Sequence, residues 1–316
     1  MAESWNHRDL MQRTATAALC HSGDVMRCVH YNVRRCVDLS NTCSRERVLS
    51  TIEHLRPTLL TLNEVDMRKT PSLVGDLERI GLPHTSFFGH VGDVYGNMLA
   101  SAVPLRNVYH THLEGGAKVQ TQDGKVHTII RGLVSASIRV HGVELRVAVT
   151  HLDHMSSEER RTQTRHVLRT FDASATANEQ CILLGDLNAL CRTDYSDAEW
   201  VAHERYNAEK GWGAPVDESS AAGVLALLRG ANFIDAFAAL ERPPDWQTPP
   251  WSAHVRDRDR PRYRIDYLWT RAPTAPFGGG RQLVPLAGCI EANCSEASDH
   301  QPVVVDFEAV AFDAGE

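Results

Sequence analysis

The chain has 316 residues, of which 42% are hydrophobic, and a formal net charge of −7. This length and apolar content allow a large core, and alternating strand and helix patterns predict an α/β or α+β layered fold in one domain rather than two. The negative charge gives no overall attraction to polyanions, and no run of about 18 apolar residues predicts a membrane span, so we expect no integral membrane association.

The first half of the chain has a loose beginning followed by regular elements. Residues 1–25 show no sustained periodicity and are predicted to be an N-terminal extension, so the domain is expected to span residues 26–316. Helices are predicted at Arg45–Leu55, where Arg56 and Pro57 end the helix, and at Pro71–Ile80, with Thr70 as the N-cap and Gly81 as the end. Strands are predicted at residues 84–90, 97–101 and 105–113.

The middle of the chain predicts a hairpin and then a long helix. Residues 126–140 and 143–150 read as two strands joined by a turn at His141 and Gly142. Residues 156–177 open with Ser-Ser-Glu-Glu, which favours a helix that packs behind the sheet, with Arg160 and Arg165 on a solvated face. A buried strand is then predicted from residue 181.

Residues 191–260 form the irregular part of the sequence and are interpreted as an insertion. Clustered aromatic and leucine residues suggest short helices, whereas paired prolines and Trp246 and Trp251 suggest a loop on the substrate side. Of the two interpretations, we prefer an insertion that is held to the sheet by its aromatic residues. The basic stretch 256–264 is either a phosphate-facing loop or a mobile one.

Eight cysteines are present, and none forms a Cys-x-x-Cys pair that would indicate a structural zinc site. An even number permits four disulfides. Cys28 and Cys181, however, lie within apolar strand-like runs where a reduced thiol fits, so free thiols in a reducing compartment are expected. Residues 14–20 are too short for a secretory signal. The expected location is therefore intracellular, cytoplasmic or nuclear.

Polar side chains repeatedly follow predicted strands. The run Cys-Ile-Leu-Leu-Gly-Asp-Leu-Asn at 181–188 ends with Asp186 and Asn188, which are two residues apart and can face the same side. Taken alone, this segment is typical of a turn. Similar runs along the chain end at Asn32, at Glu64, at His151 with His154, at Asp266, and at Asp299 with His300. Because ligands of α/β proteins bind at strand ends, these side chains are expected to converge.

This ordered set of motifs resembles the endonuclease/exonuclease/phosphatase superfamily of metal-dependent phosphoesterases. The resemblance runs across roughly residues 26–308, and Ser298-Asp-His before a strand and Gly-Asp-Leu-Asn are its most specific parts. The superfamily includes deoxyribonuclease I, abasic-site endonucleases, neutral sphingomyelinases, inositol phosphatases and tyrosyl-DNA phosphodiesterases. The resemblance implies a four-layer α/β/β/α sandwich, in which two packed mixed β-sheets are flanked by helices.

The resemblance also implies a Mg²⁺ site, with Mn²⁺ as a possible replacement. Glu64 is the expected principal ligand, because a carboxylate among oxygen donors suits these ions. Asn32 and Asp299 are expected to complete or adjust the coordination shell. A zinc site built on His151, His154 and a carboxylate is the alternative, since His-x-x-His spacing can chelate zinc.

Four further residues receive catalytic roles from the resemblance. Asp186 is expected to orient or deprotonate the attacking water, and Asn188 to hydrogen-bond the phosphoryl oxygen. His300 is expected to donate to the phosphate, while Asp266 holds the other ring nitrogen of His300 and favours the imidazolium.

Other residues are expected to contact the substrate. His151 is expected at the phosphate or leaving group, because deoxyribonuclease I, sphingomyelinase and inositol phosphatase branches carry His here whereas abasic-site endonucleases place Tyr near this role. His154 is expected in loop packing or substrate contact. Asn97, in a Gly-Asn strand, and Arg131, in Arg-Gly, match weaker motifs. Ser101 is followed by Ala-Val-Pro, without the Arg or Lys usual in the superfamily.

The predicted activity is hydrolysis of phosphodiester bonds by a metal-dependent enzyme, which is expected to be a monomer. Nucleic acid or a nucleotide adduct is the first-ranked substrate. A phospholipid or an inositol phosphate is the alternative, which Trp246 and Trp251 on an exposed loop would favour. A non-catalytic binding scaffold on the same fold is the alternative of another class.

Overall fold

The computed structural model describes residues 24–120, 124–240, 251–254, 260–274, 280–290 and 296–311. Most of the predicted N-terminal extension lies outside these residues, as do Trp246, Cys20 and Cys294. In the described part of the chain, no helix is long and apolar enough to cross a membrane.

The first of two mixed sheets is built from both ends of the chain. Its strand order is β13-β14-β1-β2-β4-β3. β1 pairs in parallel with β2 and antiparallel with β14, so the last described strand lies beside the first. The strands are β1 Val25–Asn32, β2 Leu59–Asp66, β3 His84–Val91, β4 Tyr95–Ser101, β13 Arg281–Ile290 and β14 Val303–Ala311.

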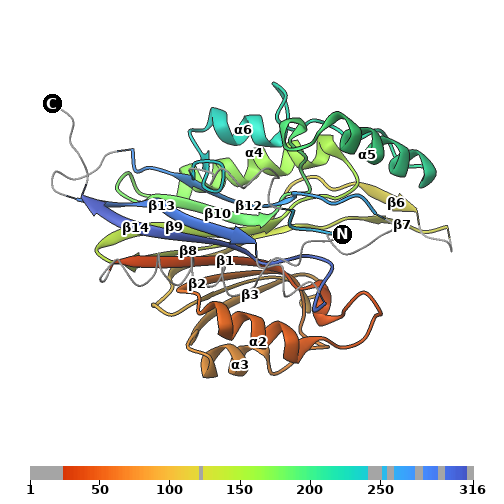
Figure 1. Cartoon of the computed structure of the whole chain (residues 1–316). Helices are drawn as coiled ribbons and strands as arrows, with labels where there is room; N and C mark the ends of the chain where they lie inside the picture. Colours follow the sequence, from red (N-terminus) through yellow and green to blue (C-terminus); the bar gives the residue numbers. More distant parts are fainter. Residues whose placement is uncertain are drawn as a thin grey trace, which may run out of the picture.

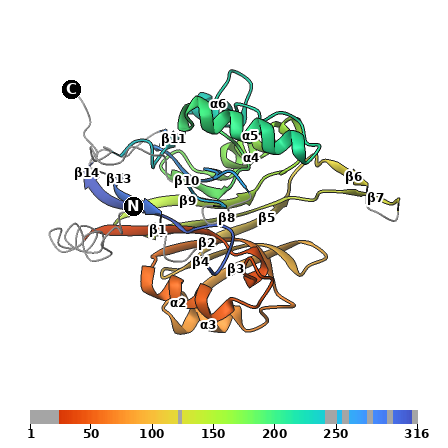
Figure 2. The ribbon, with the colours of Figure 1, turned by 45° about the vertical axis from the view of Figure 1, so that its right-hand side comes forward.

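The second sheet is built from the middle of the chain, in the order β11-β12-β10-β9-β8-β5. Here β9 and β10 are parallel, and β12 runs antiparallel to β10. A separate two-stranded ribbon, β6 and β7, reaches beyond the body of the molecule (Figure 2). The strands are β5 Arg106–His112, β6 Lys118–Gln120, β7 Val126–Thr128, β8 Gly132–Val140, β9 Val143–His151, β10 Gln180–Asp186, β11 Ile234–Asp235 and β12 Asp266–Arg271.

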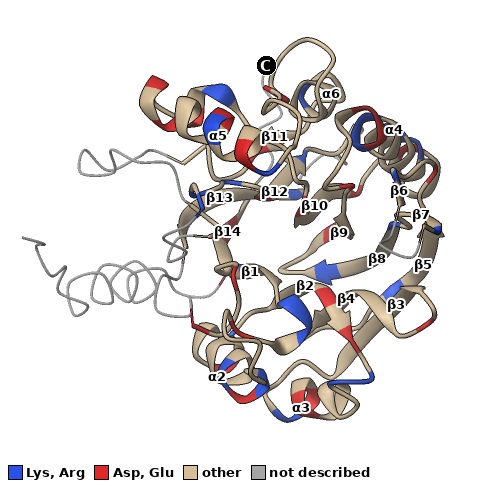
Figure 3. Ribbon diagram, turned by 90° about the vertical axis from the view of Figure 1, so that its right-hand side faces the viewer, with Lys and Arg blue, Asp and Glu red and all other residues tan. Residues whose placement is uncertain are grey.

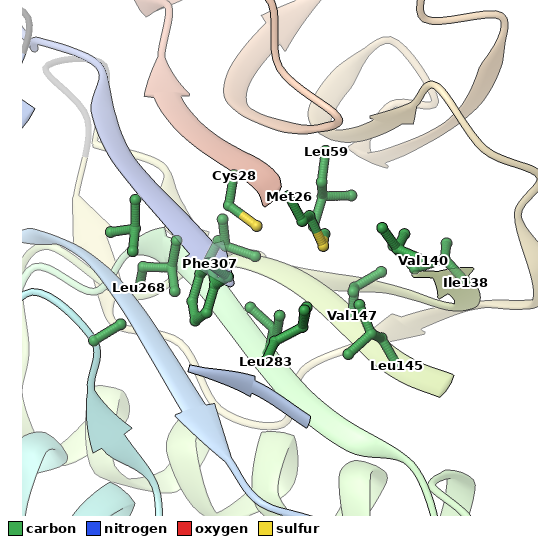
Figure 4. Packing of buried hydrophobic residues seen from close by; sticks show 14 of the residues in the cluster. Met26, Cys28, Leu59, Ile138, Val140, Leu145, Val147, Leu268, Leu283 and Phe307 are labelled. Atoms are coloured by element: carbon green, nitrogen blue, oxygen red, sulfur yellow. The ribbon is translucent and has the colours of Figure 1, made fainter. Parts of the chain in front are cut away.

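The two sheets pack face to face around a core of apolar side chains. Met26 and Cys28 of β1 and Phe307 of β14 meet Val147 of β9 and Leu268 of β12 in one buried cluster (Figure 4). Alternate residues of each strand point into this layer, while the others face the helices. Burial of this face is the main source of cohesion between the sheets.

Helices cover the outer faces, giving the predicted four-layer α/β/β/α sandwich (Figure 1). The helices α2 and α3 pack on the first sheet through a second apolar cluster. On the other side, α4 and α6 pack on the second sheet through a third cluster, and α5 lies beside them. The helices are α2 Arg45–Leu55, α3 Leu73–Arg79, α4 Ser157–Ser174, α5 Asp197–Glu209 and α6 Val224–Gly230, with short 3₁₀ turns η1 Arg34–Cys36 and η2 Arg192–Asp194.

Two local predictions need correction. Thr70 does not cap α3, because its hydroxyl donates to the Asp66 carbonyl and the helix starts after Ser72. The predicted strand 126–140 is two strands, since β7 pairs with β6 whereas β8 pairs with β5 and β9. The break falls just before Gly132.

The predicted solvated face of α4 is wrong at one residue. Arg165 is exposed, but Arg160 is buried and forms an ion pair with Glu218 at 2.8 Å. Glu218 lies in the 191–260 segment and also accepts from the backbone of Val224. The segment is therefore tied to α4 by a buried charge pair that spacing within α4 does not reveal.

Trp251 is the other correction in this segment. It is only 7% exposed, where an exposed substrate-side loop was predicted. Its ring packs against Tyr195, with centroids 5.0 Å apart, and beneath the guanidinium of Arg262. These contacts fit the preferred interpretation, in which aromatic residues hold the segment in place. That the segment is an insertion stays an interpretation.

Candidate active site

Strand pairing brings three predicted residues to one edge of the second sheet. Asp186 ends β10 and lies opposite His151 of β9 on one side and Asp266 of β12 on the other. A β-carbon added at Gly185 would lie 2.0 Å from the Thr150 carbonyl oxygen. Glycine at this position therefore allows β9 and β10 to approach closely just where Asp186 and His151 emerge.

The first sheet contributes Asn32 and Glu64 at the same edge, where β1, β2, β9 and β10 lie around the centre of the molecule (Figure 3). The Asn32 amide nitrogen donates to an Asp186 carboxylate oxygen at 3.1 Å and to Glu64 at 3.3 Å. Asn32 thus joins a carboxylate of one sheet to a carboxylate of the other. The predicted convergence of these strand ends is confirmed for this group.

Asp266 is surrounded by donors. It accepts from His300 Nδ1 at 2.8 Å and from His30 Nε2 at 3.1 Å, and Ser252 Oγ accepts from the Asp266 backbone amide at 3.0 Å. The predicted hydrogen bond between Asp266 and His300 is present. Because an ionised carboxylate only accepts, both histidines donate to it, and this fixes their tautomers.

The pKa values of the two carboxyl groups move apart. Although burial opposes it, His300 and His30 lower the pKa of Asp266 below its usual range. Burial and the neighbouring Asp266 raise the pKa of Asp186 to about 7. Asp266 is therefore a fixed anion, whereas Asp186 can exchange a proton near neutral pH, as a general base requires.

The two histidines also differ. Burial lowers the pKa of His300, but Asp266, Asp299 and Asp186 outweigh it and raise the pKa well above 6.5. Burial, with Arg131 and other neighbouring cations, lowers the pKa of His151 well below 6.5. Their Nε2 atoms lie 3.8 Å and 3.5 Å from the same Asp186 oxygen. Asp186 thus lies between an imidazolium and a neutral imidazole.

Glu64 is placed by a break in the strand pairing. The register of β2 against β4 shifts between Leu62 and Val65, and Glu64 has a left-handed φ of 57°. Bulges of this kind redirect a side chain. The Glu64 side chain is partly exposed and hydrogen-bonds Tyr95, whose pKa is raised by burial and by this carboxylate.

Of the three predicted metal ligands, Glu64 is the one placed to bind a hard divalent cation. Glu64 offers a partly exposed carboxylate, which suits Mg²⁺ or Mn²⁺. Asn32 turns its amide nitrogen toward both carboxylates, while its oxygen accepts from the Arg34 backbone, and Asp299 pairs with the Arg34 side chain at 3.5 Å. Asn32 therefore presents its nitrogen, not its oxygen, to Glu64, and Asp299 is engaged by Arg34.

Among the described residues, one group of three potential metal ligands clusters closely: Asp186, Asp266 and His300. The raised pKa of His300 keeps its ring protonated, and its Nδ1 is occupied by Asp266. An imidazolium repels a cation, so this group acts better as a proton-transfer unit than as a ligand set. Glu64 remains the better metal candidate.

The Asn188 backbone amide donates to an Asp186 carboxylate oxygen, and the Asn188 side-chain nitrogen donates to the Leu152 carbonyl oxygen at 3.1 Å.

Asn97 is fully buried. Its side-chain oxygen accepts from Asn63 and its nitrogen donates to the Gly132 carbonyl oxygen, both at 2.8 Å. Both ends of its amide thus bond within the protein, and the predicted substrate contact of Asn97 stays a prediction. Asn63 in turn accepts from the Asp186 backbone amide, so Asn97 is better described as a positioning residue.

Arg131 and His154 lie together at 3.1 Å between an Arg131 Nη and His154 Nδ1. Arg131 is buried, whereas His154 is exposed. Since guanidinium only donates, His154 Nδ1 accepts this bond. The proton of the neutral ring is then on Nε2, so neither ring nitrogen of His154 is free to bind zinc. This disfavours the alternative zinc site at His151 and His154.

Two residues of the site were missed from the sequence. His30 and Asn63 lie in apolar runs that end at Asn32 and Glu64. The signal for His30 was its spacing of two from Asn32, because alternate strand residues face the same side. Asn63 gave no such signal, since it faces opposite to Glu64 in a regular strand.

The chain is similar to proteins of a known family. The sequence matches the Endonuclease/Exonuclease/phosphatase family over residues 29–300. The chain belongs to this family. Its members are phosphoester hydrolases, which makes the chain a phosphoesterase by class. No curated protein matches the sequence significantly.

Solved structures share the fold at low sequence identity. An endonuclease/exonuclease/phosphatase from Beutenbergia cavernae has 19% identity and a TM-score of 0.63 over 90% of this chain and 72% of that one. D. rerio TDP2 complexed with single-strand DNA product has 20% identity and a TM-score of 0.58 over 90% and 100%. Sphingomyelinase C from Streptomyces griseocarneus has 16% identity and a TM-score of 0.56 over 90% and 99%. These similarities confirm the predicted family fold.

Proposed function

We propose that the chain is a divalent-metal-dependent phosphodiesterase that hydrolyses its substrate by in-line attack of water. The observation that carries this proposal is the placement of Asp186 between His300 and His151, with Asp266 behind His300. Opposed pKa shifts in neighbouring groups are what acid and base roles require.

Each residue has a step in this proposal. Asp186 accepts the proton of the attacking water, which its pKa of about 7 allows. His300, kept protonated by Asp266, donates to the phosphoryl oxygen as negative charge develops there. The neutral ring of His151 hydrogen-bonds the phosphate or leaving group, and Asn188 hydrogen-bonds the phosphoryl oxygen through the amide hydrogen that Leu152 leaves free.

Glu64 is the residue that would hold the metal ion, which we propose to be Mg²⁺, with Mn²⁺ as a replacement. A divalent ion bound there supplies charge neutralisation to the phosphoryl oxygens. Asn32 keeps Glu64 and Asp186 in a fixed relation by donating to both. Asp299 holds Arg34 beside Asn32.

Nucleic acid or a nucleotide adduct is the substrate that we propose. The shared fold with D. rerio TDP2, whose structure contains a single-strand DNA product, supports this choice. The burial of Trp251 removes one feature that favoured a lipid surface. Cys28, Cys36, Cys43, Cys181 and Cys191 are free thiols, which supports the proposed cytoplasmic or nuclear location.

The test is hydrolysis of a substrate panel with Mg²⁺ and with EDTA. The panel contains single-stranded and duplex DNA, RNA, a 5′-tyrosyl-DNA ester, sphingomyelin and inositol polyphosphates, and Asp186→Ala is the blank. We expect Mg²⁺-dependent release from the nucleic acid class. Release only from sphingomyelin or inositol phosphates would transfer the function to that class, and no release from any member would favour a binding scaffold.

Glu64→Gln tests the metal site separately. It keeps the shape of the side chain but removes its charge, so the Mg²⁺ concentration for half-maximal activity should rise by about 10-fold or more. Glu53→Gln, on the outer helix α2, is the matched control. An unchanged Mg²⁺ titration in Glu64→Gln would remove Glu64 as the ligand.

A further inference from the structure

Arg131 is a buried cation without an anionic partner. It is 5% exposed, its Nε has no hydrogen-bond acceptor, and among the described residues no carboxylate forms an ion pair with it. Its one side-chain partner is the neutral ring of His154. A buried charge in this state is costly, so it is retained where something binds it.

The other buried arginines of the described chain show the ordinary arrangement. Arg160 pairs with Glu218 at 2.8 Å, Arg264 with Asp235 at 2.5 Å, and Arg146 with Glu179 at 3.6 Å. Each of these cations is neutralised within the protein. Among the described residues, Arg131 differs from all three because no carboxylate neutralises it.

His154 adds a second donor on the exposed side. Because its Nδ1 accepts from Arg131, the proton of the neutral ring is on Nε2, and no hydrogen bond to Nε2 is formed by the described residues. His154 is exposed, so this N–H faces solvent beside the buried guanidinium. Arg131 therefore forms the buried part of one donor site, and His154 forms its exposed part.

His90 is a buried neighbour of this pair. It is 3% exposed on β3, and its ring lies against Phe88 and Tyr95, with centroids 6.0 Å and 6.3 Å apart. Burial and Arg131 lower its pKa to about 4, so the ring is neutral and does not neutralise Arg131. A β-carbon on Gly132 would lie 2.9 Å from the His90 β-carbon, so the glycine beside Arg131 lets β3 approach this point.

The donor site adjoins the catalytic cluster and is held rigidly. Arg131, His154 and His90 are all close enough to His151 to lower its pKa. Asp153, between His151 and His154, is fully buried; it accepts from the backbone of Met155 and Ser156 and from Ala117 before the β6–β7 ribbon. The donor site therefore lies beside the His151 end of the catalytic cluster.

We propose that Arg131 and His154 bind a second, non-scissile phosphate of the substrate, as a phosphomonoester next to the diester that is cleaved. A guanidinium edge and an imidazole N–H group match the several oxygens of a phosphate. This inference rests on the proposed phosphodiesterase activity and selects within it diesters that carry a neighbouring phosphomonoester.

Binding of inorganic phosphate tests the site without catalysis. Calorimetric titration of metal-free protein in EDTA should show binding that Arg131→Gln weakens by at least about 10-fold and His300→Ala retains. Arg68→Gln is the matched control, because Arg68 is an exposed arginine that pairs with Asp66. Arg131→Lys replaces Arg131→Gln if the latter does not fold. No phosphate binding by the wild type, or equal binding by the Arg131 variant, would overturn the proposal.

Selectivity gives the second test. Two substrate pairs differ by one phosphomonoester: pTpT against TpT, and glycerophosphoinositol 4-phosphate against glycerophosphoinositol. The wild type should prefer the phosphorylated member of one pair by at least about 10-fold in kcat/KM, and that pair names the source of the phosphate. Arg131→Gln should bring the ratio near one, whereas Arg68→Gln should keep it.

The two proposals fail in different ways. Turnover of these diesters without a preference in the wild type, or with a preference that survives Arg131→Gln, overturns the phosphate site and leaves the phosphodiesterase standing. Absence of turnover from all four compounds counts against the phosphodiesterase, and the phosphate titration then decides the site alone.

Discussion

Arg264 and Arg131 are both buried beside the second sheet, but among the described residues Arg264 has carboxylate partners and Arg131 has none. Arg264 contacts Asp194 at 3.0 Å and Asp235 at 2.5 Å, and it lies over the ring of Tyr267. In the part of the chain that the structure describes, the one side-chain partner of Arg131 is His154. The network around Arg264 links η2, β11 and the start of β12, whereas the strand-end cluster around Asp186 leaves donors and acceptors for a ligand.

The difference indicates how to separate structural from functional polar groups in this molecule. Within the basic stretch 256–264, the buried Arg264 is a structural cation, which corrects for this residue both predicted readings of a phosphate-facing or mobile loop. Charge neutralised inside the fold stabilises it. A buried charge without a partner, or neighbouring groups in opposite protonation states, marks a place where the substrate supplies the missing partner.

The largest effect is expected in the strand-end cluster. His300→Ala or Asp186→Ala should lower kcat by about 10³-fold or more, since we propose that both groups act on the transition state. Stability should change little for Asp186→Ala, because it removes one of two adjacent buried carboxyl groups. Steady-state kinetics with urea unfolding checks both. Normal turnover in a folded variant would refute the cluster as the catalytic site.

The next largest effect compares the two arginines directly. Arg264→Met should reduce the free energy of unfolding by about 3–5 kcal/mol, because Asp194 and Asp235 stay buried and lose the cation that neutralises them. Arg131→Met should cost about 1 kcal/mol or less, since it leaves no carboxylate behind. Urea unfolding of the two variants decides. Equal costs would end the distinction between the two sites.

Within the active site, His151 and His154 should differ. His151 contacts Asp186 and is buried, so His151→Ala is expected to lower kcat/KM by about 100-fold. His154 is exposed, and His154→Ala should lower kcat/KM by about 10-fold, mainly through KM. The reverse order in a steady-state comparison would show that the exposed site, not the strand end, carries the chemistry.

The smallest effect concerns acid stability near Arg264. His203 of α5 is buried against the rings of Tyr195 and Tyr263, and burial lowers its pKa to about 4. The folded chain then binds fewer protons than the unfolded chain between about pH 6.5 and pH 4, so stability falls as pH decreases through this range.

His203→Phe should remove about 1 to 2 kcal/mol of this loss between pH 7 and pH 5. Urea unfolding at the two pH values measures it. His54→Phe on α2 is a control, since its side chain is exposed. An identical pH dependence in His203→Phe and the wild type would show that His203 carries no part of the acid sensitivity.

Some of the site could be predicted because its signal is local. Asp186 and Asn188 follow an apolar run, and the start and end of α2 at Arg45–Leu55 are marked by sequence alone. The position of Glu64 depends on a bulge between β2 and β4, and the burial of Arg160 depends on Glu218, 58 residues away. Such pairings arise from tertiary packing, which a single sequence does not display.

Asn32 has one further consequence. It bonds a carboxylate at the end of one sheet to a carboxylate at the end of the other, while apolar side chains fill the space between the sheets. Each sheet on its own carries half of the polar set. A folding intermediate with two formed but undocked sheets would therefore be inert, and recovery of activity would report the last docking step of folding.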